Sequence, residues 1–310
     1  MAIIFPDGLP ASAILRAEGI EVLDEPRIGA PPLRVGLVNL MPDKPATETQ
    51  FARLLGSGRR DVELILTLPA THRPRNTPLR HLEDFYRPWP EVAAQGLDGV
   101  IVTGAPVELL PFGAVDYWPE LCRILDWARK RATSSFYVCW AAQAALHRFH
   151  GVGKQVLPAK LFGLFDHRLT AADSSLARGL PVRFAVPVSR YTESSVEDIA
   201  RQSGLTSVIA SAESGLCLIE DDANRAVYAF NHFEYDADTL AREYRRDLAA
   251  GEAMPMPENY FPGGNAERTP VNSWRAVARV LFQNWLHSLD RPAVQTSLRP
   301  AGRQPQWVRG

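Results

Sequence analysis

Residues 134–146 read SSFYVCWAAQAAL, and this stretch decides the fold. Its first five residues form a β-prone run, whereas the alanine-rich remainder favours a helix. Cys139 stands where the two patterns meet. A nucleophile at a strand-to-helix corner is held out of the strand, and its sulfur faces the positive end of the helix, which stabilises a thiolate. The stretch is therefore compatible with a reactive cysteine, but taken alone it favours a small cysteine that only fills the core, so other parts of the chain must decide.

The patterns before this corner alternate between strand and helix. They lie at residues 33–40, 62–68 and 98–104 for strands and at residues 47–55 and 117–130 for helices. Such alternation is typical of parallel strands with helices on both faces, whose ligands bind at the carboxyl ends of the strands. The sequence thus predicts an α/β fold with a mostly parallel sheet, and it places Asn39, Gly104 and Cys139 at one edge.

The second half of the chain is richer in strand patterns. These lie at residues 183–188, 207–211, 216–220 and 226–231, and helical patterns return at residues 236–250 and 274–289. We expect one domain over residues 33–290, preceded by an arm, residues 1–32, that lies on it. Residues 291–310 are rich in Pro, Arg and Gln, which indicates a loose tail.

Composition excludes several classes of function. A chain of 310 residues with 46% hydrophobic content can bury a full core, and its 34 basic and 35 acidic residues form no long block of one sign. No nucleic-acid surface is expected. The cysteines, Cys122, Cys139 and Cys217, are too widely spaced for a CxxC metal or redox site, which favours the cytoplasm and no metal. No leader pattern or membrane-length apolar run is found, so we expect a soluble protein without a membrane partner.

Residues 229–236 offer a base for the thiol. His232 follows a β-rich run, and Glu234 lies two residues further on, so both side chains point the same way from an extended segment. His232 can pair with the sulfur while Glu234 fixes the tautomer of the imidazole. The alternative is a surface histidine beside a helix-capping acid. His72 and His81, in a polar loop rich in Arg and Pro, are poorer candidates.

Seven short strings, in order from about Leu33 to about Leu289, carry a resemblance to a known family. They are NLMP (39–42), TETQF (47–51), RNTP (75–78), VTGAP (102–106), YWP (117–119), VCWA (138–141) and NYFP (259–262). Together they resemble homoserine O-acyltransferases of the MetA type. The resemblance implies a fold similar to class I glutamine amidotransferases, with flavodoxin-like layers. Tyr137 and Ala141 replace the glycines that flank the nucleophile in amidotransferases, which argues against glutamine hydrolysis.

The resemblance also implies the reaction. An acyl group passes from acyl-CoA to Cys139 and then to the side-chain hydroxyl of homoserine, the entry to methionine synthesis. His232, held by Glu234, assists both steps, and the backbone N–H of Trp140 is a candidate donor to the oxyanion. No cofactor is implied, because acetyl-CoA is a co-substrate. The family further suggests a homodimer.

The family's amino-acid-binding positions fall on Lys160, Ser189 and Arg246 of this chain. A guanidinium and an ammonium suit the homoserine carboxylate, and a serine hydroxyl suits the zwitterion. Without the resemblance, Lys160 and Arg246 would be interpreted as solvated surface residues. Lys44 matches a family lysine near the acyl site, although Asp43 replaces a basic residue that some relatives carry.

Glu108 is the position that, in this family, largely decides the acyl group. A glycine leaves room for succinyl, whereas a glutamate fills the space and repels the succinyl carboxylate. Two carboxylates about 4 Å apart repel by about 1 kcal/mol in bulk water and by several in a partly buried site. Acetyl-CoA is the predicted donor, with succinyl-CoA as the alternative. Glu108 can also be a residue that only caps or decorates a loop.

Three alternatives to this function remain open. A cysteine hydrolase or amidotransferase on the same fold would release its product to water, and a silent binding protein would keep the scaffold without the chemistry. Serine in place of homoserine differs by one methylene, which is worth only roughly 1 to 3 kcal/mol in a pocket.

Overall fold

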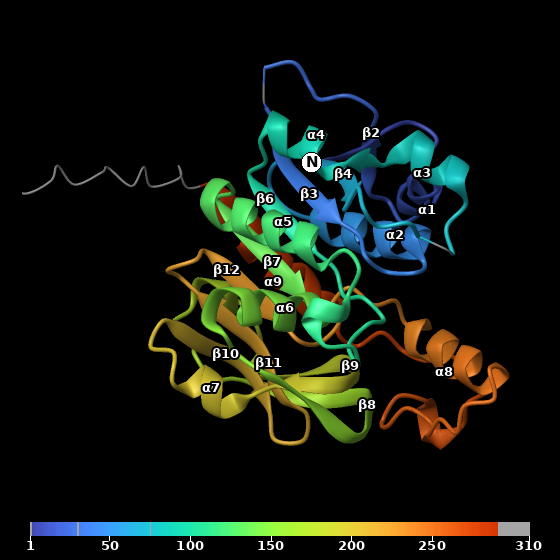
Figure 1. The fold of residues 1–310 in the computed structure, drawn as a ribbon. Helices are drawn as coiled ribbons and strands as arrows, with labels where there is room; N and C mark the ends of the chain where they lie inside the picture. The colour runs from blue at the N-terminus through green and yellow to red at the C-terminus, as the bar shows by residue number, and fades with distance from the viewer. Residues whose placement is uncertain (1, 30, 75, 291–310) are drawn as a thin grey trace, which may run out of the picture.

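The computed structural model describes residues 2–29, 31–74 and 76–290, and its strands join into a single sheet (Figure 1). The strands are β1 (Ala2–Ile4), β2 (Glu21–Leu23), β3 (Leu33–Val38), β4 (Val62–Leu68), β5 (Arg87–Pro88), β6 (Gly99–Val102), β7 (Ser134–Val138), β8 (Lys154–Leu169), β9 (Arg183–Ser194), β10 (Leu205–Ser211), β11 (Gly215–Asp221) and β12 (Ala226–Ala229). Their order is β2-β1-β4-β3-β6-β7-β12-β11-β10-β8-β9, with β5 beside β4. Neighbours are parallel from β2 to β12 and antiparallel from β12 to β9.

Helices cover both faces of the parallel part. The helices are α1 (Ala11–Ala17), α2 (Lys44–Leu55), α3 (Leu79–Phe85), α4 (Trp89–Gln95), α5 (Trp118–Arg131), α6 (Trp140–His150), α7 (Val196–Ala200), α8 (Thr239–Ala249) and α9 (Arg275–Leu289), of which α7 and α8 lie beside the antiparallel part (Figure 1). In β7, Phe136 and Val138 pack with α2 and α9, whereas Tyr137 packs with α5 and α6. This alternation buries the strand on both sides. The predicted α/β fold with helices on both faces is confirmed.

The N-terminal segment is an edge of the sheet, whereas the sequence predicted an arm lying on the domain. β1 pairs in parallel with β4, where Ile3 lies opposite Val62, and β2 pairs with β1. Ala2, Ile3 and Ile4 are buried. Pairing with an open sheet edge buries the apolar side chains of this short run, which stabilises the fold, and it also protects that edge from pairing with other chains. The predicted tail, residues 291–310, lies outside the described residues.

The antiparallel part contains β8, a strand of 16 residues that the sequence patterns did not predict. Pro158 interrupts it, and its pairing with β9 shifts register between Val156 and Leu161. A proline cannot donate to the ladder, so the alternating pattern is broken at this point. β8 and β9 bring Lys160 and Ser189 toward the same end of the sheet, because Phe162 pairs directly with Ser189.

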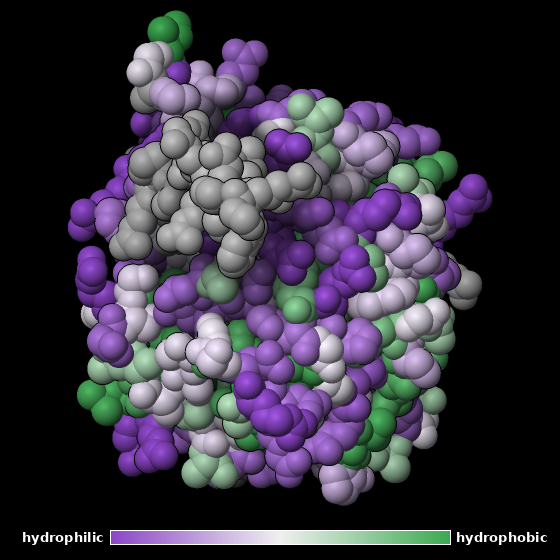
Figure 2. All heavy atoms as spheres, turned by 60° about the vertical axis from the view of Figure 1, so that its left-hand side comes forward, coloured by the Kyte–Doolittle hydropathy of each residue, from purple (hydrophilic) through white to green (hydrophobic). Residues whose placement is uncertain are grey.

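Hydrophilic side chains prevail on the face of the molecule in Figure 2, and hydrophobic ones are scattered among them. The large hydrophobic side chains that are exposed come from separate segments, such as Leu79 of α3, Val182 before β9 and Val271 before α9. None of the helices in the described ranges is both long and apolar enough to cross a membrane.

Candidate active site

Cys139 lies at the corner between β7 and α6. Its backbone has φ 52° and ψ −118°, a conformation that residues other than glycine rarely adopt. Holding such a residue costs on the order of 1–3 kcal/mol, which the surrounding structure must offset. The Cys139 N–H donates to the carbonyl of Ala229 at 2.7 Å and ties the corner to β12. The side chain is 8% exposed, and it lies at the amino end of α6.

Gly104, in the loop after β6, provides the space for this cysteine. A Cβ atom at Gly104 would lie 3.1 Å from the Cys139 Cβ and 3.7 Å from both its Sγ and the Met41 Sδ. The backbone N–H groups of Gly104 and Ala105 have no acceptor among the described residues. Trp140 is the first residue of α6, so its N–H group lacks an acceptor within the helix. Unpaired N–H groups thus lie on both sides of the thiol.

Gly104→Ala is expected to crowd the thiol. Overpacking of this kind costs typically about 1–3 kcal/mol and forces the neighbours to move. We expect alkylation of Cys139 by iodoacetamide to slow by about tenfold, measured by the intact mass over time. Gly113→Ala is the matched control, because an added Cβ there meets nothing within 4 Å. Equal alkylation rates in the two variants would contradict this account of Gly104.

His232 and Glu234 form a buried pair. The Nδ1 atom of His232 lies 2.7 Å from Oε1 of Glu234, and the imidazole stacks on Tyr235 with ring centroids 4.0 Å apart. Burial lowers the pKa of His232, but the Glu234 carboxylate and the Cys139 sulfur together raise it by more, so the net pKa lies well above 6.5. The imidazole therefore carries a proton at neutral pH.

Glu234→Gln is expected to lower the pKa of His232. The carboxylate that opposes the effect of burial is then lost, so the alkaline limb of any activity that needs the His232 proton moves to lower pH. We expect activity to fall by roughly 10²–10⁴-fold, the range that a positioned general acid or base contributes. NMR titration of ¹⁵N-labelled imidazole measures the shift, with exposed Glu213→Gln as the control. An unchanged His232 titration would contradict the assignment.

A second buried polar network supports His232 from behind. Arg190 donates to the Asn231 side chain and to the Ser214 carbonyl, and Nε2 of His167 lies 2.8 Å from Nδ2 of Asn231. Burial lowers the pKa of His167 to about 4, so it accepts at Nε2 as a neutral ring. Asn231 precedes His232 directly, and this network fixes the segment that presents the base.

One cavity, of about 450 Å³, brings most of the predicted site residues together. Its walls contain Met41, Pro42, residues 104–110, Cys139, Lys160, Ser189, Tyr191, His232, Tyr235, Glu243 and Arg246. Glu234 is not among them, because it stands behind the imidazole. The cavity offers a thiol, an imidazole and several fixed charges. In the described ranges, no three His, Cys, Asp or Glu side chains are grouped to hold a metal ion.

Tyr235 and Glu243 are cavity residues that the sequence patterns did not single out. Glu243 accepts hydrogen bonds from the Tyr235 hydroxyl at 2.7 Å and from the Ser189 hydroxyl at 2.6 Å. The ammonium of Lys160 lies 3.9 Å from Glu243 and 3.4 Å from Asp247. Both acids lie on α8, whose charged sequence is also what a solvated helix face would show. Their four-residue spacing was the available signal.

Lys160 and Arg246 differ in the solvent exposure of their side chains. The Lys160 side chain is 7% exposed and its ammonium lies 4.2 Å from the centroid of the Phe162 ring, so it is not a surface lysine. Arg246 is 63% exposed and donates from Nε to Oδ1 of Asp247 at 2.7 Å. One cation is therefore fixed inside the cavity and the other stands at its mouth.

Glu108 is held in the cavity wall by β9. Its Oε2 accepts from the backbone N–H groups of Tyr191 at 2.8 Å and Thr192 at 3.1 Å. Lys154 donates to the carbonyls of Glu108 and Leu110 and so fixes the loop. The Glu108 carboxylate is therefore fixed in the cavity wall by the Tyr191 and Thr192 N–H groups and does not lie on a free loop.

Lys44 does not line the cavity itself, but it contacts Met41, which does. Its ammonium is fully buried and donates to the carbonyls of Asn39 at 2.6 Å and Met41 at 3.2 Å. Burial lowers its pKa to about 8, although Glu48 acts in the opposite direction. Lys44 thus shapes the turn that carries Met41 into the cavity wall.

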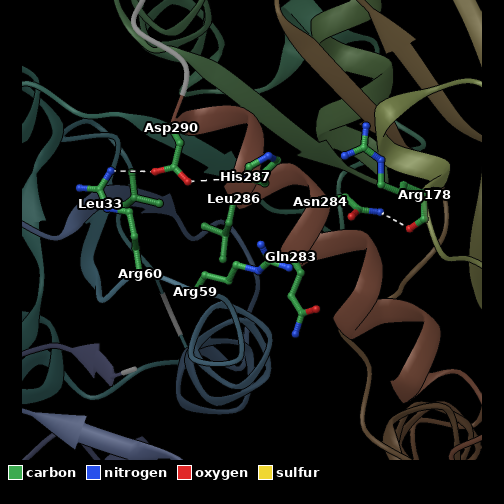
Figure 3. Close-up of a pocket in the computed structure, with 9 residues that line it drawn as sticks. All are labelled: Leu33, Arg59, Arg60, Arg178, Gln283, Asn284, Leu286, His287 and Asp290. Carbon is green, nitrogen blue, oxygen red and sulfur yellow. Dashed lines mark hydrogen bonds and ion pairs between the residues drawn. The ribbon is translucent and has the colours of Figure 1, made fainter.

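A smaller cavity of about 150 Å³ lies at the other end of the sheet (Figure 3). Leu33, the first residue of β3, lines it together with Arg59, Arg60 and Arg178. Arg60 donates to Asp290 at 2.7 Å. Cys139 follows the carboxyl end of β7, which is parallel to β3 through β6. None of the predicted site residues lies in this cavity.

Comparisons with known proteins agree with the resemblance seen in the sequence. The family model described as homoserine O-succinyltransferase (HTS) matches residues 2–292. A protein of Rhizorhabdus wittichii named homoserine O-acetyltransferase is 51% identical over 294 residues, which cover 94% of this chain and 92% of that protein. One of Brucella canis with the same name is 47% identical over 292 residues, covering 93% and 95%.

The solved structure of a glutamine amidotransferase from Methylobacillus flagellatus shares the fold. Its TM-score is 0.52 at 14% identity, over 85% of this chain and 97% of that chain. The predicted likeness to amidotransferases in fold is confirmed. With a family model that spans nearly its whole length and relatives near 50% identity, the chain belongs to the homoserine O-succinyltransferase family.

Proposed function

We propose that this acyltransferase is a homoserine O-acetyltransferase that carries the acetyl group on Cys139. One observation carries the proposal: a single cavity contains the thiol of Cys139, the imidazole of the His232–Glu234 pair, and the charges of Lys160 and Glu243. The names of the relatives support both the acceptor and the acetyl group.

In the first step the Cys139 thiolate attacks the carbonyl carbon of acetyl-CoA. The new bond from sulfur to the acetyl carbon forms as the bond to the CoA sulfur breaks, and the His232 imidazolium gives its proton to the departing CoA thiolate. The oxyanion of the tetrahedral intermediate accepts from the N–H of Trp140 and from the unpaired N–H groups after β6. Because one thioester replaces another, this step is close to balanced in energy.

In the second step homoserine receives the acetyl group. Its ammonium meets Glu243, and its carboxylate meets Arg246 and Lys160, which places the hydroxyl toward Cys139. His232, now neutral, takes the hydroxyl proton as the oxygen attacks the thioester. Cys139 leaves as a thiolate beside the restored imidazolium, and the cycle closes.

Glu108 favours acetyl over succinyl in two ways. Its charge repels a second carboxylate, and it already occupies the Tyr191 and Thr192 N–H groups that a succinyl carboxylate would need. We further propose that the enzyme needs no cofactor beyond its two substrates, works as a homodimer, and lies in the cytoplasm, where thiols stay reduced.

The test is a product assay with purified protein and acetyl-CoA. Homoserine, serine or water alone serves as acceptor, and mass spectrometry quantifies the products. The proposal expects O-acetylhomoserine as the main product, with serine slower by roughly 10-fold or more for the missing methylene. Release of acetate at an equal rate without an amino acid would instead identify a hydrolase. Glutamine should yield no glutamate.

A further inference from the structure

A second cavity adjoins the active site on the side away from the amino-acid-binding charges. We name it the loop cavity, because residues 71–74 and 76 of the loop after β4 line it, and its volume is about 860 Å³. It shares five lining residues with the Cys139 cavity, namely Met41, Pro42, Pro106, Val107 and Leu110. The two cavities therefore adjoin along these five residues.

The lining of the loop cavity suits a long ligand with an apolar stretch and an anionic end. Leu40, Val115 and Tyr117 give it apolar walls, and Arg73 provides a guanidinium. Arg73 has no carboxylate partner among the described residues, so its charge is available to a ligand. The carboxylate of Asp116, which also lines the cavity, accepts from the Tyr117 N–H at 2.9 Å.

The loop that carries Arg73 is anchored at its base. The buried Glu120 of α5 accepts from the backbone N–H groups of Ala70 at 2.9 Å and Thr71 at 2.8 Å, and from the Thr71 hydroxyl at 2.6 Å. The next residue, His72, packs edge-to-face against Tyr117 with ring centroids 4.7 Å apart. Burial and then the Lys44 charge lower the pKa of His72, which leaves Arg73 as the cation at neutral pH.

We propose that the loop cavity binds the CoA part of the acyl donor. In this arrangement the pantetheine arm lies along the apolar wall and Arg73 binds a phosphate. The thioester passes Pro106 and Val107, which line both cavities, and reaches Cys139. This inference rests on the proposed acyl-CoA chemistry. The loop cavity offers about 860 Å³ beside the 450 Å³ around Cys139, so a long acyl donor has room to extend away from the thiol.

The cavity in Figure 3 is the competing phosphate site, because three arginines line it. It lies at the amino end of β3, however, and the sheet separates it from the thiol. Arg60 is already paired with Asp290. Arg59 of this cavity, which has no carboxylate partner in the described chain, is therefore a matched control for Arg73.

The experiment compares two acetyl donors in steady-state kinetics. Acetyl-CoA carries phosphates, whereas S-acetyl-N-acetylcysteamine ends before them. Arg73→Ala should raise the KM for acetyl-CoA by about tenfold, the usual effect of losing one charge-assisted hydrogen bond. It should leave the KM for the short donor and for homoserine unchanged. Arg59→Ala should change none of the three.

A second variant tests the cavity itself without touching its charges. Ala114 is exposed and lines only the loop cavity, so Ala114→Trp fills that space without disturbing the core. It should raise the KM for acetyl-CoA and leave both the short donor and the melting temperature unaffected. If both variants acetylate Cys139 with wild-type KM values, the loop cavity is not the CoA site, although the proposed function stands. An effect of Arg59→Ala alone would move the site to the cavity in Figure 3. Failure of acetyl-CoA to acetylate wild-type Cys139 would instead overturn the proposed function.

Discussion

Cys139→Ala is expected to reduce acetyl transfer by at least about 10³-fold, because the variant has no atom that can hold the acetyl group. The change removes only the sulfur from a residue that is 8% exposed, so the fold is expected to persist with a loss of about 1 kcal/mol. Product formation from acetyl-CoA and homoserine measures the first effect, and thermal unfolding measures the second. Cys139→Ser tests the same point with the shape kept, since an alcohol is a weaker nucleophile at neutral pH.

The other two thiols provide matched controls. Cys217 is fully buried in β11, where burial raises its pKa to about 12, and Cys122 lies half-buried in α5. Neither lines the active-site cavity. Cys122→Ala is expected to retain wild-type turnover, and Cys217→Ala is expected to lose only stability. Full turnover by Cys139→Ala would rule out a covalent acyl-cysteine.

Glu108→Gly is expected to shift the enzyme from acetyl-CoA toward succinyl-CoA. The substitution removes the repelling carboxylate and also frees the N–H groups of Tyr191 and Thr192, which then form a receptor for the distal carboxylate of succinyl. Two charge-assisted hydrogen bonds and the lost repulsion together predict a change of roughly 10²–10³ in the ratio of the two kcat/KM values. Steady-state kinetics with both donors at fixed homoserine measures this ratio.

Glu108→Gln separates the two causes. The amide oxygen still occupies the Tyr191 N–H but carries no charge, so this variant is expected to use succinyl-CoA far less well than Glu108→Gly. If Glu108→Gln switches donors as fully as Glu108→Gly, repulsion alone decides specificity. Glu193→Gln, on β9 next to Thr192 but outside the cavity, is the control and keeps the wild-type ratio. A ratio unmoved by Glu108→Gly contradicts the specificity argument.

The parts of the site that depend on local sequence could be predicted. The corner at Cys139 follows from a strand pattern that changes to a helix pattern within one residue, and the shared direction of His232 and Glu234 follows from their spacing of two. The parallel half of the sheet follows from regular alternation of elements. In each case a short range of neighbours determines the conformation.

The parts that depend on distant pairing could not be predicted. Glu243 acts in the cavity only because β9 brings Ser189 to α8, and no pattern within either segment indicates this contact. Strand β8 was not predicted, because Pro158 and a register shift break the alternation of its side chains. The burial of Lys44 depends on the carbonyls of Asn39 and Met41, which only the folded turn brings to its ammonium.

The acyl-enzyme itself provides the most direct test of the central claim. Wild-type protein is mixed with acetyl-CoA, quenched within milliseconds, and digested so that the peptide containing Cys139 is analysed by mass spectrometry. We predict one acetyl group on Cys139, formed at least as fast as kcat and lost on adding homoserine with equal formation of O-acetylhomoserine. Turnover at the normal rate with no acetyl group on Cys139 at any time would contradict the account.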